Sequence, residues 1–226
     1  MLERALADAR TLAAGGADAL IIENLGDCPF TAGSVDAFTI AAMTRIAGAV
    51  RAADLPMGIN VLRNDALGAL AVAAAAEADF IRVNVHTGVM VADQGVLTGT
   101  ARQTLLERRR LGVRVAIAAD VHVKHAVPLG DSRIEDAAHD TWHRGDADVL
   151  IISGAGTGKP TDPTDVRTVR AAVPESTIWI GSGISTNRPL PEEADGAIVG
   201  TYLHRDSDLT APLDPERVAA MRALLS

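Results

Sequence analysis

Short apolar runs alternate along the chain with longer stretches whose apolar positions repeat at a helical period. The short runs are rich in valine and isoleucine, which is typical of the buried strands of a parallel sheet. The pattern predicts seven strands, at Ala19–Glu23, Met57–Val61, Phe80–Val85, Val113–Ala119, Val149–Ile152, Thr177–Ile180 and Gly196–Val199.

Helix-like segments separate these strands, and several of them begin at a residue suited to capping a helix. The expected helices are Leu2–Ala14, Ser34–Ala53, Asn64–Ala78, Thr98–Leu111, Arg133–Arg144, Asp162–Val173 and Asp214–Leu225, with a short turn at Gly200–His204. Regular alternation of strands and helices implies a parallel sheet with right-handed crossovers. No linker-like stretch interrupts the alternation, so we predict one α/β domain over residues 1–226.

A TIM-type (β/α)8 barrel is the favoured fold, with an open doubly wound sheet as the second choice. A closed barrel of this type has eight strands, whereas the pattern gives seven and begins with a helix. We therefore expect an N-terminally short barrel that lacks the first strand. That strand would come either from roughly 25–35 residues upstream of Met1, about one strand–helix unit, or from another chain.

Composition narrows the class of protein. The 226 residues include 41 alanines and 20 glycines but only six aromatic residues, so the core is expected to pack from small side chains. The net charge of −8 gives no basic field, and nucleic-acid binding is not expected. No apolar run approaches the ~20 residues of a membrane-spanning helix. A single cysteine and the absence of a secretion-type leader predict a cytoplasmic protein. The oligomeric state stays open, a homo-oligomer included.

Polar residues gather at the predicted carboxyl ends of the strands, where proteins of this class bind ligands. Because side chains alternate along a strand, Arg82, Asn84 and His86 are expected to share the inner face. A buried arginine needs a carboxylate partner, for which Glu23 or Asp120 is available. The cluster either fills the lumen as a structural network or forms a polar ligand pocket. Its candidate ligand-binding members are Asn60, Arg82, Asn84 and His86.

The segment Asp120–His125 is the richest in acid–base side chains. Asp120, His122 and Lys124, together with Glu23, are the candidates for proton transfer or Schiff-base chemistry. A divalent metal is an alternative that is not favoured, because the chain has neither an HExxH motif nor paired CxxC motifs. The residues that would supply its ligands are His86, Asp120, His122 and His125. The cofactor stays unknown.

A glycine-rich stretch, Ser153–Pro160, follows the fifth predicted strand. It is not a Walker phosphate loop, because a proline stands where that motif needs serine or threonine. Its backbone could still cradle an anion, so Gly154, Gly156 and Lys159 are candidate ligand-binding residues. The alternative is a mobile lid that needs glycine only for its conformation.

The last two predicted strands are also followed by glycine. In phosphate-binding barrels these two loops hold the phosphate. Ser182, Gly183, Gly200 and Thr201 are therefore candidates for binding a phosphate or another small anion.

Six segments of the chain resemble the BtpA/SgcQ family. The segments are Ile22–Phe30, Gly58–Asp65, Phe80–Gly88, Ala119–His125, Gly154–Lys159 and Gly181–Gly183. The resemblance spans essentially the whole chain and implies a TIM barrel of the ribulose-phosphate-binding type. Members of this family usually begin with a strand and a His-Leu-Pro-like segment, and this chain starts after that point.

The resemblance leaves two functional hypotheses, because one branch of the family is implicated in photosystem I biogenesis and another lies among sugar-utilisation genes. The first hypothesis is a barrel that binds a phosphorylated or anionic small molecule and carries out an aldolase- or isomerase-like step, as a sugar-phosphate lyase or isomerase. The second is a noncatalytic photosystem I biogenesis factor that uses the barrel as a scaffold.

Overall fold

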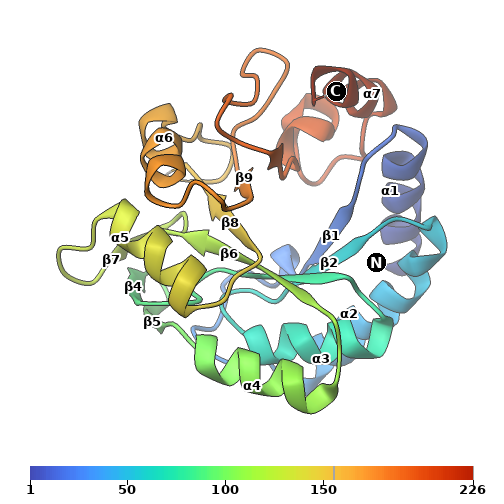
Figure 1. The fold of residues 1–226 in the computed structure, drawn as a ribbon. Coiled ribbons are helices and arrows are strands. Elements are labelled where there is room, and N and C mark those ends of the chain that lie inside the picture. Colours follow the sequence, from blue (N-terminus) through green and yellow to red (C-terminus); the bar gives the residue numbers. More distant parts are fainter. Residues whose placement is uncertain (155, 226) are drawn as a thin grey trace.

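Seven parallel strands form one curled sheet, a half-barrel with helices on its outer face, in the computed structural model (Figure 1). The structure describes residues 1–154 and 156–225. The strand order is β1-β2-β3-β6-β8-β9-β10, so β1 and β10 are the edges of the sheet. The strands are β1 (Leu20–Glu23), β2 (Met57–Asn60), β3 (Phe80–Val83), β6 (Ala116–Val121), β8 (Val149–Ile152), β9 (Ile178–Ile180) and β10 (Gly196–Ala197). The α/β class and the seven predicted strands are confirmed.

The helices lie between these strands in the predicted order. They are α1 (Leu2–Ala14), α2 (Ala37–Val50), α3 (Ala66–Ala76), α4 (Ala101–Leu111), α5 (Ile134–His139), α6 (Pro163–Ala172) and α7 (Pro215–Leu225). The Asp162 carboxylate accepts a bond from the backbone of Thr164, which confirms the predicted cap of α6. The caps of α2 and α3 are Asp36 and Asp65, which stand later than the predicted helix starts.

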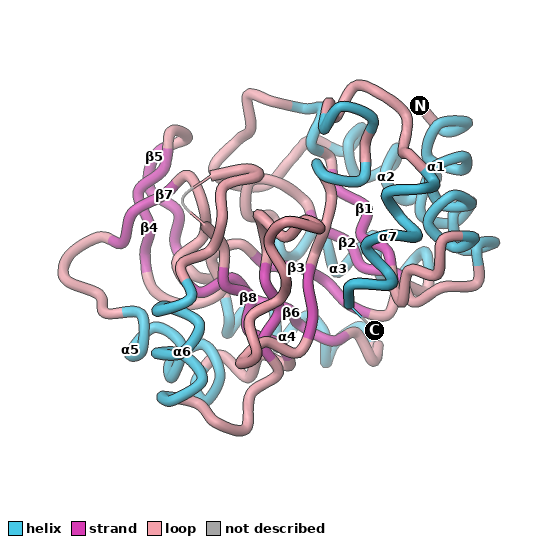
Figure 2. Tube along the Cα trace, turned by 90° about the horizontal axis from the view of Figure 1, so that it is seen from above, coloured by secondary structure: helices cyan, strands magenta, loops and turns pink. Residues whose placement is uncertain are grey.

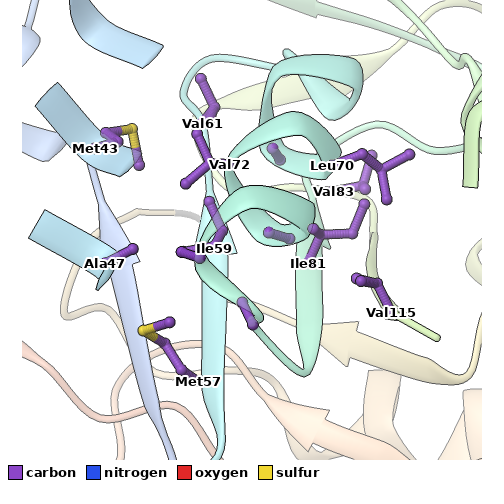
Figure 3. Close-up of a cluster of buried hydrophobic side chains, with 14 of the residues drawn as sticks. Met43, Ala47, Met57, Ile59, Val61, Leu70, Val72, Ile81, Val83 and Val115 are labelled. Atoms are coloured by element: carbon purple, nitrogen blue, oxygen red, sulfur yellow. The ribbon is translucent and has the colours of Figure 1, made fainter. Parts of the chain in front are cut away.

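The outer face of the sheet packs against α2 and α3 (Figure 3). Ile59 of β2 and Ile81 of β3 point to this side and are fully buried against side chains such as Met43 and Leu70. Alanine at many helix positions lets the helices lie close to the strands, as the composition predicts. Alternation along β2 and β3 then turns the intervening residues toward the lumen.

The lower part of the lumen is apolar. Phe80 of β3 and Trp179 of β9 meet edge to face, with ring centroids 5.5 Å apart. Gly58 of β2 faces the Phe80 ring, and a Cβ added there would lie 2.2 Å from a ring carbon. This apolar layer leaves the buried polar side chains of the lumen nearer the carboxyl ends of the strands.

Replacing Gly58 by alanine is expected to lower the free energy of unfolding by about 1–3 kcal/mol, because the Phe80 ring would have to move inside a packed lumen. Urea unfolding measures this. Gly48→Ala in α2 is the matched control, since no atom lies within 4 Å of the added methyl group. That control should gain about 0.5–1 kcal/mol from helix propensity. Equal stability of both variants would contradict close packing of Gly58 against the Phe80 ring.

A second, three-stranded antiparallel sheet of order β5-β4-β7 is not predicted by the pattern of apolar positions. Its strands are β4 (Val89–Ala92), β5 (Gly95–Thr98) and β7 (Ala126–Pro128). Figure 2 shows this sheet on the side of the molecule away from α1 and α7. Met90 and Leu97 pack it onto Val85 and Val123, which follow β3 and β6. The small sheet therefore forms a wall beside the carboxyl ends of these two strands.

Two of the expected element boundaries are wrong. Thr98 belongs to β5 instead of opening a helix, and α4 begins at Ala101. The strand predicted at 113–119 runs from Ala116 to Val121, so β6 begins three residues later than expected and includes Asp120. Of the helices in residues 1–154 and 156–225, none combines the length and the apolar character needed to cross a membrane.

Candidate functional site

A buried ion-pair network occupies the upper lumen. Arg82 of β3 donates from Nε and Nη2 to the two carboxylate oxygens of Asp120 in β6, at 3.0 and 2.9 Å. Its Nη1 donates to Glu23 of β1 at 3.3 Å. The side chains of Arg82 and Asp120 are 2% and 0% exposed, whereas Glu23 is 24% exposed. The predicted pairing is confirmed with both carboxylates, which neutralise a charge that burial alone would make costly.

Electrostatics favours the charged form of Arg82. Burial opposes the charge of Arg82, but Asp120 and Glu23 outweigh burial and raise the pKa of the guanidinium. Asp120 also accepts bonds from Asn84 at 2.9 Å and from the Ser153 hydroxyl at 3.2 Å. Both oxygens of Asp120 are thus already occupied, so Asp120 positions Arg82 and is poorly placed to act as a free base.

Two buried amides leave acceptors open in the upper lumen. Asn60 donates to Glu23 at 2.9 Å, and Asn84 donates to Asp120. A carboxylate accepts only from an NH₂ group, so both amide orientations are fixed. Within residues 1–154 and 156–225, the Oδ1 atoms of Asn60 and Asn84 have no hydrogen-bond partner although they are buried. Such atoms call for a donor such as a ligand hydroxyl or water.

Two further cations face this network. Arg63, in the loop after β2, is only 4% exposed, and its Nη2 donates to the backbone carbonyl of Lys124. In the described part of the chain its Nε has no acceptor, and neither Arg63 nor Lys124 forms a salt bridge. Burial, followed by the nearby charge of Arg82, lowers the pKa of Lys124. Burial likewise lowers the pKa of Arg63. Two desolvated cations without carboxylate partners favour an anionic ligand.

A cavity of about 560 Å³ is lined by Lys124, whose backbone carbonyl accepts the bond from Arg63. It lies between the small sheet, the segment that follows β6, the start of the loop after β8, and α6. Its volume is in the range of small-molecule sites. The residues that line the cavity include Val91, Asp93, His122, Lys124, Ser153 and Asp165. Ser153 links the cavity to the Arg82 network, because it lines the cavity and its hydroxyl donates to Asp120.

The predicted histidines after β6 lie at this cavity but not together. His122 lines the cavity with its Nε2 3.4 Å from the Ser132 hydroxyl, and burial lowers its pKa against the opposing charge of Asp165. His125 accepts the backbone N–H of Thr157 on Nε2 at 3.1 Å. An accepting Nε2 leaves the proton on Nδ1, which describes a neutral imidazole. Burial, Arg63 and Lys124 lower the pKa of His125 in the same direction.

The ligand set considered for a divalent metal does not converge. Among residues 1–154 and 156–225, no group of three or more histidine, cysteine or acidic side chains is close enough to hold a metal ion. His86 in particular leaves the inner face: its Nε2 lies 2.8 Å from the carbonyl oxygen of Gly145, on the helix side. The expectation that His86 shares a face with Arg82 and Asn84 is wrong. β3 ends at Val83; Asn84 still reaches Asp120, but the chain departs from the strand before His86.

The glycine-rich loop after β8 folds across the turn after β9. Gly154 donates its N–H to the Ser182 hydroxyl at 2.9 Å, and this hydroxyl donates to the carbonyl of Lys159 at 3.0 Å. A Cβ on Gly183 would lie 2.5 Å from Cα of Pro160. Gly183 also has a φ of +83°, so glycine is needed there for two reasons. The predicted residues Gly154, Lys159, Ser182 and Gly183 thus lie together, because the two loops contact each other.

The remaining predicted residues stand at the edges of this arrangement. Gly156 lies beside His125, whose ring would be 3.2 Å from an added Cβ. Gly200 has open space around it, and Thr201 begins the 3-10 turn Thr201–Leu203. Among the hydrogen bonds of the described residues, none links Gly200 or Thr201 to Ser182 or Gly183.

Comparison with known sequences gives a family and named relatives. Residues 1–225 match the model of the BtpA family. The photosystem I biogenesis protein BtpA of Synechocystis is 45% identical over 223 residues, which cover 97% of this chain and 78% of that protein. An uncharacterized protein of Thermococcus kodakarensis is 44% identical over 96% of this chain and 83% of its own length. The putative sgc region protein SgcQ of Escherichia coli is 29% identical over 97% and 82%.

Comparison with solved structures gives the fold. Thiamine phosphate pyrophosphorylase from Pyrococcus furiosus superposes with a TM-score of 0.61 at 16% identity, over 97% of this chain and 88% of that one. Phosphoribosyl anthranilate isomerase from Thermococcus kodakaraensis gives 0.60 at 14% identity, over 96% and 93%. These TIM-barrel enzymes share the architecture of the chain.

Proposed function

Because the chain belongs to the BtpA family, we propose that it binds a phosphorylated or other anionic small molecule at the mouth of its half-barrel. One observation carries the proposal: Lys124 lines the cavity, Arg63 contacts its backbone, both are desolvated, and no carboxylate in the described residues forms a salt bridge with either. An anionic group between them would supply the missing charge. Glu23 and Asp120 are already committed to Arg82.

The open amide oxygens narrow the ligand class. Asn60 and Asn84 present buried acceptors next to the Arg82 network, and hydroxyl groups of a sugar would satisfy them. The names of two structural neighbours point the same way, since one names a thiamine phosphate and the other a phosphoribosyl compound. Ser182, Gly183, Gly200 and Thr201 stay candidates for a phosphate group, as do Gly154, Gly156 and Lys159, provided that the glycine-rich loop moves off the turn after β9.

The proposed chemistry is an aldolase- or isomerase-like step on a sugar phosphate. Lys124 and His122 line the cavity, and Glu23 is the least buried member of the ion-pair network. These three are the proton-transfer candidates. Asp120 takes the role of a positioning residue, because it fixes the guanidinium of Arg82 through two bonds.

The second proposal is a noncatalytic photosystem I biogenesis factor in the cytoplasm, which the name of the Synechocystis relative supports. The identities to the Synechocystis and Thermococcus relatives, 45% and 44%, are too similar to favour this role by themselves. A scaffold would need the mouth only for stability or for sensing a ligand, so turnover separates the two proposals.

A thermal-shift screen of triose, tetrose and pentose phosphates, with and without Mg²⁺ or Mn²⁺, tests the binding proposal. At least one sugar phosphate is expected to raise the melting temperature of the wild type. The shift should disappear in Lys124→Ala and Arg63→Ala and persist in Arg102→Ala, whose side chain is exposed on α4. No shift with any phosphate, or an equal shift in all three variants, would sink the proposal.

A further inference from the structure

We propose that Lys124 forms an imine with the carbonyl group of an anionic substrate. This inference rests on the proposed binding function and adds a covalent step to it. The substrate class it names is an aldehyde or ketone that also carries a phosphate or carboxylate. Arg63 would hold the anionic group, which leaves the amine of Lys124 for the carbonyl carbon.

The position of Lys124 carries the argument. The residue follows β6, lines the 560 Å³ cavity, and is fixed at its backbone by the bond from Arg63 to its carbonyl. Its side chain is near Arg82, Glu23 and Asp120, the network that fills the upper lumen. Within residues 1–154 and 156–225, Nζ makes no hydrogen bond or salt bridge, since both neighbouring carboxylates are bound to Arg82. An unpaired amine that faces a ligand-sized cavity is free to act as a nucleophile.

The surroundings also favour the reactive form of the amine. Burial and the charge of Arg82 lower the pKa of Lys124, and Arg63 acts in the same direction. A lower pKa means that a larger share of Lys124 is neutral at a given pH than of an exposed lysine. Only the neutral amine has the electron pair that attacks a carbonyl carbon.

The step balances without an external oxidant or reductant. Nζ of neutral Lys124 forms a bond to the carbonyl carbon, and the π electrons move to the carbonyl oxygen. A proton passes from nitrogen to that oxygen and gives a carbinolamine. A second proton then allows the hydroxyl to leave as water, and the nitrogen electron pair forms the C=N bond. Glu23 is the nearby group that can relay these protons, because its only bonds in the described residues fall on Oε1.

The composition of the chain makes the test specific. Lys124 and Lys159 are its only lysines, so a reduced adduct can be mapped among three amines, the amino terminus included. Wild-type protein is incubated with dihydroxyacetone phosphate or with pyridoxal 5′-phosphate, each treated with sodium borohydride. Intact mass should show one adduct per chain, and peptide mapping should place it on Lys124. Lys159 and the amino terminus serve as internal comparisons.

The variant Lys124→Arg keeps a cation but removes the nucleophile, so it should lose the adduct with both probes. Arg102→Ala should keep it. Adduct yield at Lys124 should rise with pH and reach its half-maximum at a lower pH than the adduct of a free lysine derivative, because burial lowers the pKa of Lys124. Labelling that spares Lys124 with both probes, or that favours Lys159 or the amino terminus, would overturn the imine. If sugar phosphates still shift the melting temperature in that case, the binding proposal stands without the covalent step.

Discussion

Replacing Arg82 by alanine is expected to lower the free energy of unfolding by about 3–5 kcal/mol, the largest effect on stability that the structure predicts. Among residues 1–154 and 156–225, the change removes the only cation that is paired with Asp120, whose side chain is 0% exposed. Asn84 and Ser153 would still donate to the carboxylate, but no formal charge would balance it. Urea unfolding followed by circular dichroism measures the loss.

Arg51→Ala is the matched control for Arg82. Arg51 also pairs with an aspartate at 2.9 Å, but both side chains are more than 40% exposed. Exposed pairs contribute about 0–1 kcal/mol. Similar losses in the two variants would mean that burial of the Arg82 network does not matter for stability, which contradicts the structure.

Replacing Arg63 by alanine is expected to weaken the binding of a sugar phosphate by about 10–100-fold. A loss of this size in binding free energy corresponds to one hydrogen bond to a charged group, about 1.5–3 kcal/mol. Arg63→Lys should lie between the wild type and the alanine variant, because an ammonium keeps the charge but not the fork of donors. Isothermal titration calorimetry on each variant measures the dissociation constant.

Two controls accompany Arg63. Its guanidinium also supports the backbone at Lys124, so the melting temperature of the unliganded variant reports any structural loss separately. Raising the salt concentration should weaken binding to the wild type more than to Arg63→Ala, because the variant has one cation fewer at the mouth. Unchanged affinity in a folded Arg63→Ala protein would place the anionic group elsewhere.

The fold and the ion-pair network could be predicted because both follow from strand alternation. Seven buried apolar runs gave the strands of the half-barrel. Within them, the period of two placed Arg82 and Asn84 on one inner face, and the cost of burying an arginine demanded Glu23 or Asp120. The period of two no longer predicts the direction of a side chain once the chain has left the strand. His86 is three residues beyond β3 and contacts Gly145 in place of the lumen.

The parts that were missed depend on contacts between distant segments. Arg63 follows a polar strand end in a loop, and only the approach of Lys124, 61 residues later, reveals its role. The β4–β5 hairpin had a local signal, since Asp93-Gln94 is a two-residue turn followed by Gly95 at a φ of +107°. β7 has three residues and contains a proline, so sequence alone gives no strand signal there.

The position of a bound sugar phosphate is the decisive test of ligand binding at Arg63 and Lys124. Crystals of the protein soaked with the sugar phosphate that gives the largest thermal shift should show its anionic group within hydrogen-bond distance of the Arg63 guanidinium, with Lys124 Nζ facing the rest of the ligand. Hydroxyl groups should lie near Oδ1 of Asn60 and Asn84. A ligand bound away from Arg63 and Lys124, with those two cations paired to carboxylates of the protein, would contradict the account.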